Sequence, residues 1–482
     1  MASKRKSEVK VVIIGAGIAG LSAAQHLQQN GFQKITILEA SDRIGGRIHT
    51  MAFGKSESDL VDLGAQWIHG EGKENSVYRL AKKYGMLKPL IRLEWGTGVC
   101  CNEEGKEIRQ ELVDDAIDKG FEIETELEKV YRRNRHLPED ELTIQDFYNK
   151  RFDQIVATEF PEADREDAKS VFNYFLNLMR FDNGDDLRHL CSRNVGQYRS
   201  IGEKEDVCLP YGFQSVINAL LRLMTKVKII LERAVDKIIW IDSKNRTNDV
   251  KIICADGTEF IADHVIVTCS LGYLQKYHES LFEPALPLNK SQALYQIGYG
   301  TVNKIFLYYD EPFWTKGQGT IRFAWTDKNK DINNTDEWYK AIHAFDEPHN
   351  NAHVLVGSVV GEEGKYVESL DKEEIKRICT VQIRMFLNDE SIPAPRDVLV
   401  TKWNSDKWSC GSYSYMKQES SESRRNDLGQ PLFNDDNKPV VLFAGEAYHK
   451  TRYSTTDGAR SSGIDQAQIL VNFYTNQCRR SF

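Results

Sequence analysis

The sequence predicts an α/β fold (α+β overall) built on a Rossmann-type dinucleotide-binding domain, and two local patterns indicate it. Residues 9–14 form an apolar run typical of a buried strand, and a Gly-x-Gly-x-x-Gly turn at 15–20 follows directly and opens a helix. A second strand at 34–38 ends in Glu39, nineteen residues after Gly20. A carboxylate at this distance is suited to accept hydrogen bonds from the ribose hydroxyls of a dinucleotide.

The residues of the glycine turn have separate roles. Gly15 permits the tight turn, Gly17 lets the backbone approach a pyrophosphate, and Gly20 lets the helix and strand pack closely. Free N–H groups at the helix start favour that pyrophosphate. We expect Ala16 and Ala19 to touch the dinucleotide as well. The alternative interpretation is a glycine turn in another α/β protein.

A second glycine pair follows the acidic residue and narrows the choice of dinucleotide. Arg43, Gly45, Gly46 and Arg47 stand where nicotinamide enzymes rarely carry paired glycines with two arginines. Arg47 is placed to reach the pyrophosphate from the other side, and the two glycines keep side chains out of its way. These residues therefore favour a dinucleotide other than a nicotinamide cofactor.

With this segment, the chain resembles the flavin-dependent amine oxidases, and within them the polyamine oxidase branch. The other matching segments are 63–70 (LGAQWIHG), 301–307 (TVNKIFL), 442–446 (LFAGE) and 453–458 (YSTTDG). The resemblance implies an FAD-binding domain and a mixed-sheet-and-helix substrate domain. It also implies oxidation of spermine, spermidine or their N1-acetyl derivatives. Hydride passes to flavin, the imine hydrolyses to an aldehyde and a shorter amine, and O2 becomes hydrogen peroxide.

The flavin is expected to be bound without a covalent link. The related monoamine oxidases attach flavin to a cysteine where this chain has Ser412. Cys410 lies two positions away and does not replace that cysteine on this alignment.

Two residues are the candidates for catalysis. Lys304 lies inside an apolar strand, where a lysine is costly unless it has a partner or a lowered pKa. The resemblance implies that it holds a water beside the flavin ring; the alternative is an edge-strand lysine that points to solvent. The resemblance also places His69 at the substrate entrance near the reacting amine, and the alternative there is a structural histidine.

The resemblance implies further contacts with substrate and cofactor. Tyr413 and Tyr453 would form an aromatic pair that flanks the substrate, although each could be a core tyrosine. The other expected substrate-binding residues are Trp67, Asp206 and Ser454. The other expected cofactor-binding residues are Ala65, Gln66, Trp67, Val235, Trp403, Gly445, Glu446, Thr455 and Thr456. The last two open a helix whose dipole would stabilise negative charge on the reduced flavin.

Substrate choice is left open by the sequence. Asp206 matches an acid that relatives direct toward the remote amine. Met179 stands where mammalian relatives carry a glutamate, which leans slightly toward an acetylated substrate. Asp182, Asp185 and Asp186 either replace that glutamate or merely cover a loop.

The cofactor motifs are spread over the chain, so the domains are expected to be discontinuous. Residues 1–95, 205–290 and 395–482 would form the FAD-binding domain, and 96–204 with 291–394 the substrate domain.

The two substrate-domain segments differ in pattern. The sequence from 110 to 190 reads as helical, and its charged stretch 111–131 is interpreted as a solvated helix face. Aromatic-rich strands alternate with polar loops from 300 to 400, which predicts the sheet of that domain.

Composition excludes several classes of protein. The 482 residues carry a net charge of −8, which does not indicate nucleic acid and favours the approach of polycations. Nine scattered cysteines predict reduced thiols and no metal site, as in the cytoplasm. No membrane span or signal peptide is indicated. The basic residues 4–6 leave a nuclear location open. We expect a monomer.

Three other families share some of these motifs and are less compatible with the sequence. A histone lysine demethylase shares the catalytic domain but would need a chromatin-binding module and a helical insertion that 482 residues cannot hold. Desaturases and porphyrinogen oxidases lack the segments around Lys304 and His69. Flavin-free escort proteins for prenylated GTPases lack the paired glycines with Arg47 and the residues Thr455 and Thr456.

Overall fold

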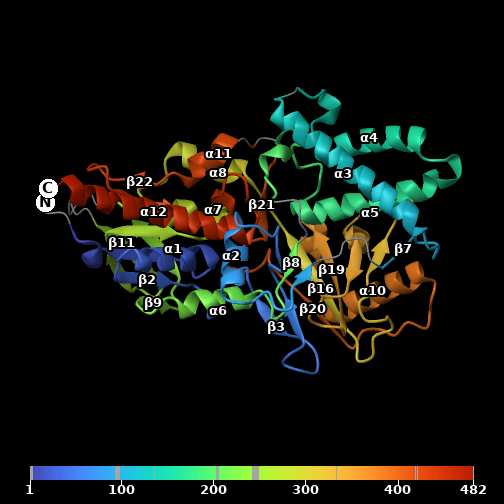
Figure 1. The fold of residues 1–482 in the computed structure, drawn as a ribbon, viewed down its shortest axis with the longest axis horizontal. Helices are drawn as coiled ribbons and strands as arrows, with labels where there is room; N and C mark the ends of the chain where they lie inside the picture. The colour runs from blue at the N-terminus through green and yellow to red at the C-terminus, as the bar shows by residue number, and fades with distance from the viewer. Residues whose placement is uncertain are drawn as a thin grey trace.

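The computed structural model describes residues 4–92, 98–134, 136–201, 206–241, 249–332, 334–417, 420 and 422–480. It confirms the predicted α/β class. Strands β2 and β9 with helix α1 occupy one end of the molecule, and helices α3, α4 and α5 with a second large sheet occupy the other (Figure 1).

The first end is a six-stranded, mostly parallel sheet in the order β22-β23-β13-β1-β2-β9. Its strands come from distant parts of the chain: β1 Lys10–Ile14, β2 Lys34–Leu38, β9 Val227–Ile230, β13 His264–Val267, β22 Leu432–Phe433 and β23 Pro439–Phe443. Helices α1 (Ile18–Gln29) and α12 (Thr456–Arg480) pack against each other beside it (Figure 1). The first two strands and the glycine turn lie where the sequence predicted them.

A mixed sheet in the order β12-β11-β10-β14 adjoins the mostly parallel one; β12, β11 and β10 are antiparallel, and β14 pairs with β10 in parallel. Its strands are β10 Val235–Ile239, β11 Val250–Cys254, β12 Glu259–Ala262 and β14 Phe282–Glu283. The Asp-Gly turn between β11 and β12 forms the predicted hairpin, and Gly257 supplies its positive φ of 82°.

The second end contains a six-stranded sheet in the order β20-β16-β19-β18-β17-β7. Its strands are β7 Val99–Cys101, β16 Val302–Tyr308, β17 Ile321–Phe323, β18 Ala344–Asp346, β19 Val354–Val360 and β20 Asp397–Val400. Every residue of β16 is buried between two antiparallel neighbours. Lys304 therefore lies in an inner strand, and the edge-strand alternative is wrong.

Strand β20 pairs with β16, so residues 397–400 contribute to the sheet of the second end. The division of the chain into two discontinuous domains stays a prediction. The expected boundaries at 95/96 and 204/205 lie outside the described residues.

Helices α3 (Gln110–Arg132), α4 (Ile144–Glu159) and α5 (Arg165–Asn183) form the predicted helical region. Aromatic side chains fill the space between them, and the rings of Phe152 and Phe172 stack with centroids 3.5 Å apart. Gly120 lets α3 approach α5 closely, because a Cβ there would lie 2.6 Å from the ring of Phe175. Among the described residues, no helix combines the length and apolar character that crossing a membrane requires.

The remaining strands and helices surround the sheets of the two ends and link them. The remaining strands are β3 Thr50–Ala52, β4 Leu60–Asp62, β5 Trp67–Ile68, β6 Ile91–Arg92, β8 Val207–Cys208, β15 Gly298–Gly300 and β21 Tyr413–Tyr415. The remaining α-helices are α2 Ser76–Lys83, α6 Gln214–Arg222, α7 Leu271–Leu281, α8 Leu288–Gln296, α9 Gly361–Val367, α10 Lys372–Leu387 and α11 Glu422–Gly429. The short 3-10 helices are η1 Lys6–Glu8, η2 Glu139–Glu141, η3 Glu162–Asp164, η4 Ser192–Gln197, η5 Thr335–Ala341 and η6 Glu446–Tyr448.

Candidate active site

A cavity of about 780 Å³ runs from the glycine turn to helices α3 and α5. It brings together most residues that the sequence selected, from all parts of the chain. These are Gly15, Gly17, Ala19, Glu39, Gly45, Gly46, Arg47, Ala65, Gln66, Trp67, His69, Asp206, Val235, Lys304, Trp403, Tyr413, Gly445, Glu446, Tyr453, Ser454, Thr455 and Thr456. Ala16, Gly20 and Arg43 are not among the lining residues.

The three glycines of the turn differ in what surrounds them. Gly15 has a φ of +104°, which only glycine adopts without strain. A Cβ on Gly20 would lie 2.1 Å from the carbonyl oxygen of Gly15, so this glycine is required for the helix to pack. A Cβ on Gly17 would meet only the carbonyl oxygen of Gly45, at 3.9 Å. The space beside Gly17 is therefore open on the cavity side, where a dinucleotide backbone would pass.

The carboxylate of Glu39 lies at the end of β2 and is held by neighbouring donors. The backbone N–H of Ala16 donates to it at 2.7 Å, and the backbone N–H and hydroxyl of Ser41 donate at 2.9 Å each. The nearby guanidinium of Arg43 has a buried Nη1 without a hydrogen-bond partner among the described residues. An unpaired buried donor of this kind fits an anionic or polar ligand group.

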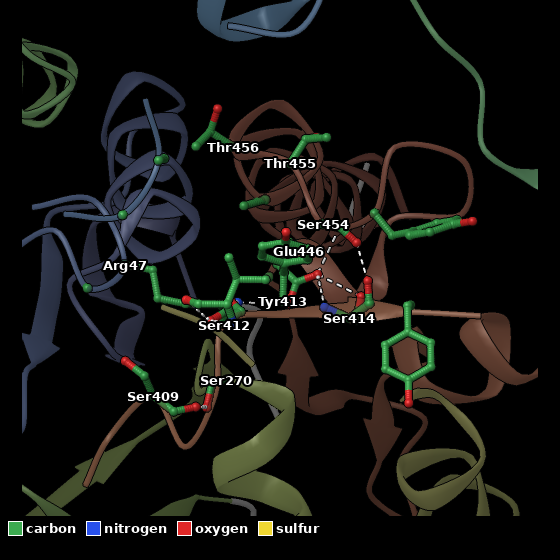
Figure 2. Close-up of a pocket in the computed structure, with 18 of the residues that line it drawn as sticks. Arg47, Ser270, Ser409, Ser412, Tyr413, Ser414, Glu446, Ser454, Thr455 and Thr456 are labelled. Atoms are coloured by element: carbon green, nitrogen blue, oxygen red, sulfur yellow. Dashed lines mark hydrogen bonds and ion pairs between the residues drawn. The ribbon is translucent and has the colours of Figure 1, made fainter. Parts of the chain in front are cut away.

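A charged network lies deeper in the cavity (Figure 2). Nη1 of Arg47 donates to Oε1 of Glu446 at 2.9 Å and to the carbonyl oxygen of Ser412 at 2.7 Å. Oε2 of Glu446 accepts from the hydroxyl of Ser414 at 2.7 Å and from the backbone N–H of Ser454 at 3.0 Å. Both carboxylate oxygens are fixed, so this wall is rigid before any ligand binds.

The first turn of α12 faces the same part of the cavity. Thr455 caps the helix, because its hydroxyl accepts from the N–H of Gly458 at 2.9 Å. Ser454 has a φ of +66°, a left-handed conformation that its hydrogen bonds to Glu446 and Ser414 hold in place. The free N–H groups of the helix start and its dipole favour negative charge at this point.

The amine of Lys304 uses all three of its donors on protein oxygens. Nζ lies 2.9 Å from the carbonyl oxygens of Asp62 and Gly64 and 2.8 Å from Oε1 of Gln66. Burial lowers the pKa of Lys304 to about 8, with the charge of Asp62 acting in the opposite direction. Nζ is 5.8 Å from the centroid of the Trp67 ring. A water held by this amine would have to replace one of the three oxygens.

His69 and Asp206 form a pair on the cavity wall. Nδ1 of His69 lies 2.9 Å from one carboxylate oxygen of Asp206, and the N–H of Gly70 donates to the other at 3.2 Å. Burial opposes the imidazolium, but the hydrogen bond and charge of Asp206, with the charge of Asp182, raise the pKa of His69. Asp206 therefore engages His69, whereas the sequence predicted that it reads the remote amine; that role stays a prediction.

The two candidate substrate tyrosines both line the cavity. The hydroxyl of Tyr413 donates to the carbonyl oxygen of Phe181. The ring of Tyr453 meets that of Tyr198 edge-on, with centroids 5.5 Å apart. Nearby, the indole N–H of Trp403 donates to the carbonyl oxygen of Leu63 at 3.2 Å. The hydroxyl of Tyr413 and the indole N–H of Trp403 are thus already satisfied by protein carbonyl groups.

The acidic residues of the far part of the cavity were not predicted from the sequence. Glu124 and Glu128 of α3 line it together with Asp182 of α5, so the interpretation of 111–131 as a solvated face is wrong for two of its residues. Burial, with the charges of Asp182 and Glu128, raises the pKa of Glu124 to about 8. Glu128 pairs with Arg132 at 2.6 Å.

Glu124 and Asp182 differ from the other acids of the cavity. Within the described ranges, neither has a hydrogen-bond or ion-pair partner. Burial raises the pKa of Asp182, the charge of Asp206 adds to that effect, and the charge of His69 opposes it. The charge of Asp182 acts on both His69 and Glu124, so Asp182 lies on the side of the far end that is nearer to His69.

The other candidates near Asp182 have different positions. Met179 lines the cavity and is buried. Asp185 lies 3.3 Å from Nδ1 of His189, and Asp186 pairs with Arg188 at 2.8 Å. Neither of these two acids is among the lining residues, so within that cluster only Asp182 faces the cavity.

Ser412 stands at the position where a covalent flavin link was considered. Its hydroxyl accepts from the N–H of Val302 at 2.8 Å and donates to the carbonyl oxygen of Val302 at 2.9 Å. Cys410 is not a lining residue, and its thiol faces the carbonyl oxygen of Lys407 at 3.4 Å. No thiol is therefore offered at this position.

Comparison with known proteins identifies the family. The family model described as flavin containing amine oxidoreductase matches residues 18–471. The chain is 32% identical to the peroxisomal N(1)-acetyl-spermine/spermidine oxidase of Bos taurus, covering 98% of this chain and 96% of that protein. It is 30% identical to the probable polyamine oxidase 5 of Arabidopsis thaliana, covering 97% and 99%.

A solved structure has the same fold. It is that of a putrescine oxidase bound to putrescine, with a TM-score of 0.70 and 19% identity over 96% of this chain and 99% of that one. The cavity fits a flavin dinucleotide, given the open space beside Gly17 and the position of Glu39 on its wall. The cofactor of this chain is FAD, and the chain belongs to the family of flavin-containing amine oxidoreductases.

Proposed function

We propose that the chain is an FAD-dependent polyamine oxidase that prefers substrates with free distal amines. The reacting amine lies at the flavin end of the cavity, and a distal ammonium lies between Glu124 and Asp182. The similarity to proteins named polyamine oxidase and N(1)-acetyl-spermine/spermidine oxidase supports the substrate class.

The proposed reaction balances with O2 and water as co-reactants. Bound FAD would supply the acceptor for a hydride from the carbon beside the amine and the route by which two electrons and two protons reach O2 to give hydrogen peroxide. The amine becomes an imine, and water cleaves it to an aldehyde and a shorter amine. The chain binds and orients the substrate, excludes bulk water and holds protons.

Each catalytic candidate has a role that its contacts support. Lys304, with a pKa of about 8, can hold or release a proton near neutral pH beside Gln66 and Trp67. His69, paired with Asp206, supplies a second proton-holding group on the wall of the cavity. The rings of Tyr413 and Tyr453 align the alkyl chain between these groups.

The preference for free amines depends on one observation: Glu124 and Asp182 line the cavity without partners among the described residues. Two unpaired carboxylates in a poorly solvated cavity repel each other, and this repulsion is relieved by a cation. An ammonium satisfies both, whereas an acetylamide carries no charge. Apolar neighbours such as Leu178 and Ile144 suit the methylene runs between amines.

The test is a peroxide assay with spermine, spermidine, their N1-acetyl forms and a monoamine, made on wild type and on Glu124→Gln/Asp182→Asn. We expect the double variant to raise KM for spermine about 10-fold, since a charge-assisted contact contributes about 1.5–3 kcal/mol. KM for the substrate acetylated at its distal end should change little.

Glu122→Gln, on the solvent side of α3, is the matched control. Equal losses on both substrates contradict the preference, and activity on monoamines alone contradicts the substrate class.

We also propose that the flavin is not covalently attached. Position 412 is a serine, and the thiol of Cys410 faces the carbonyl oxygen of Lys407 and does not line the cavity. Acid precipitation of the purified protein should leave the yellow colour in the supernatant. Colour in the pellet would mean a covalent link elsewhere.

We further propose a cytoplasmic monomer. Eight free cysteines among the described residues, seven of them buried, are compatible with a reducing compartment. Microscopy of a tagged chain and its elution volume test the two proposals, and peroxisomal fluorescence, as in the printed name of the bovine relative, contradicts the first.

A further inference from the structure

Arg425 is a fully buried guanidinium that lies directly behind the active site. It belongs to α11, has no exposed surface, and does not line the cavity. Its Cζ lies 3.8 Å from the centroid of the Tyr453 ring, which does line the cavity. The guanidinium therefore stacks on the face of the ring that points away from the substrate space.

The hydrogen bonds of Arg425 join this ring to the Glu446 network. Nη1 donates to the hydroxyl of Ser414 at 3.2 Å and to the carbonyl oxygen of Ala447 at 2.8 Å. The same hydroxyl donates to Glu446 at 2.7 Å. Nη2 of Arg425 is buried and has no partner among the described residues.

The charge of Arg425 is not neutralised. Glu446 is the carboxylate nearest in this network, and it already forms an ion pair with Arg47. Burial lowers the pKa of Arg425 to about 10, opposed by Tyr453 and Glu446, so the group stays cationic at neutral pH. Two guanidinium groups thus share one carboxylate, and this wall carries a net positive charge.

The other titratable groups that face Arg425 come from several elements. They are Glu446 and His449 in and after η6, Tyr453 before α12 and, acting on the Tyr453 ring, Tyr131 of α3 and Asp182 of α5. His449 is neutral at pH 7, because burial and the charges of Arg452 and Arg425 lower its pKa to about 4. Glu446 is the carboxylate that interacts with Arg425 and it is shared with Arg47, whereas Asp182 acts on the Tyr453 ring from the cavity side and, within the described ranges, forms no ion pair with the guanidinium.

We propose that Arg425 is a positioning residue that fixes the Tyr453 ring and keeps this wall positive, so that the amine at this end binds in its neutral form. An amine on the open face of the ring would lie near an unpaired cation, and its ammonium form is disfavoured. A ring whose one face is taken by a guanidinium also attracts a second cation less. The amine must lose its proton before the adjacent carbon gives up a hydride, so Arg425 prepares the substrate. This inference rests on the proposed amine oxidation.

The experiment follows flavin reduction by saturating spermine, without oxygen, as a function of pH. The rate rises as the bound amine loses its proton, and the midpoint reports that ionisation. Arg425→Met should move the midpoint to more alkaline pH by about one unit or more, because the cation is gone. Arg425→Lys keeps the charge but not the planar fork, so the midpoint should stay while KM rises a few-fold.

Lys290→Met is the matched control. Lys290 is also a buried cation beside an aromatic ring, with Nζ 4.2 Å from the Phe443 centroid, but it binds the end of α11 and does not line the cavity. The pH midpoint of flavin reduction in Lys290→Met should equal that of wild type. If Arg425→Met does not fold, Arg425→Gln keeps hydrogen-bonding capacity without charge and carries the same expectation. An unchanged midpoint in the neutral variant overturns the inference, and failure of wild type to be reduced by any polyamine overturns the proposed function instead.

Discussion

The two ends of the cavity are built in opposite ways. At the flavin end, the carboxylates of Glu39 and Glu446 and the amine of Lys304 all have partners within the protein. At the far end, Glu124 and Asp182 have none among the described residues. The first end is thus preorganised before a ligand arrives, and the second is completed only by a cation. This difference predicts that mutations at the flavin end change rates, and mutations at the far end change substrate affinity.

The largest effect is expected from Lys304→Met. Removing an amine that holds three oxygens and has a pKa of about 8 should slow flavin reduction or reoxidation by about 10²-fold and leave flavin content intact. Stopped-flow measurement of both half-reactions checks this, with Lys290→Met as a buried-lysine control. Unchanged rates in both half-reactions would show that Lys304 is structural, and a change in KM alone would break the contrast between the ends.

Two neighbouring glycines sharpen the same contrast within the flavin end. Gly17→Ala should leave the apoprotein as stable as wild type, since its Cβ meets only Gly45 at 3.9 Å, but should weaken FAD binding about 10- to 100-fold. Gly20→Ala should lower the melting temperature of the apoprotein itself, because its Cβ would lie 2.1 Å from a backbone oxygen. Melting curves with and without FAD separate the two, and equal losses of apoprotein stability would contradict this assignment.

The flavin end could be predicted from sequence because its determinants are local. Strands β1 and β2, Glu39 and the glycine turn all lie within the first 47 residues. Gly15 and Gly20 are required by the backbone itself, and Gly17 keeps space open for the ligand, as the motif expresses. The residues farther along the chain were selected by resemblance, and most of them do line the cavity.

The far end could not be predicted in this way. Glu124 and Glu128 look like ordinary solvated acids four residues apart, and nothing local says which face of α3 meets a cavity. They flank the buried stripe that includes Gly120 and Ile123, which a helical wheel would have shown. Arg425 was missed for a similar reason: α11 is so polar that its sequence favours an exposed helix, and only packing behind Tyr453 buries the guanidinium.

Asp206→Asn tests the junction between the two ends. Loss of the charged partner should lower the pKa of His69 and raise KM about 10-fold, because a charge-assisted hydrogen bond contributes about 1.5–3 kcal/mol. Steady-state kinetics with free and acetylated substrates measures it, and Asp185→Asn, which alters an Asp–His contact outside the cavity, is the control. A loss shared by both substrates fits the pairing with His69. A loss confined to the free amine would assign Asp206 to the remote ammonium, as the sequence suggested.

The smallest expected effect is on stability, and it tests whether the far end is costly without substrate. The pKa of Glu124 is raised to about 8 in the folded protein, above the usual value near 4.3. The folded state therefore binds the proton more tightly than the unfolded state, so the stabilisation by this group is complete below pH 4 and is lost as pH rises to 8. Glu124→Gln should raise the melting temperature of the substrate-free enzyme by about 2 °C at pH 8.5, by less at pH 5, and leave it unchanged below pH 4. With spermine at pH 8.5, wild type should melt at a higher temperature than the variant, because only wild type offers the ionised carboxylate to the ligand. If the variant is no more stable than wild type at pH 8.5 without substrate, the charge of Glu124 is already compensated within the protein. The contrast between the two ends would then depend on Asp182 alone.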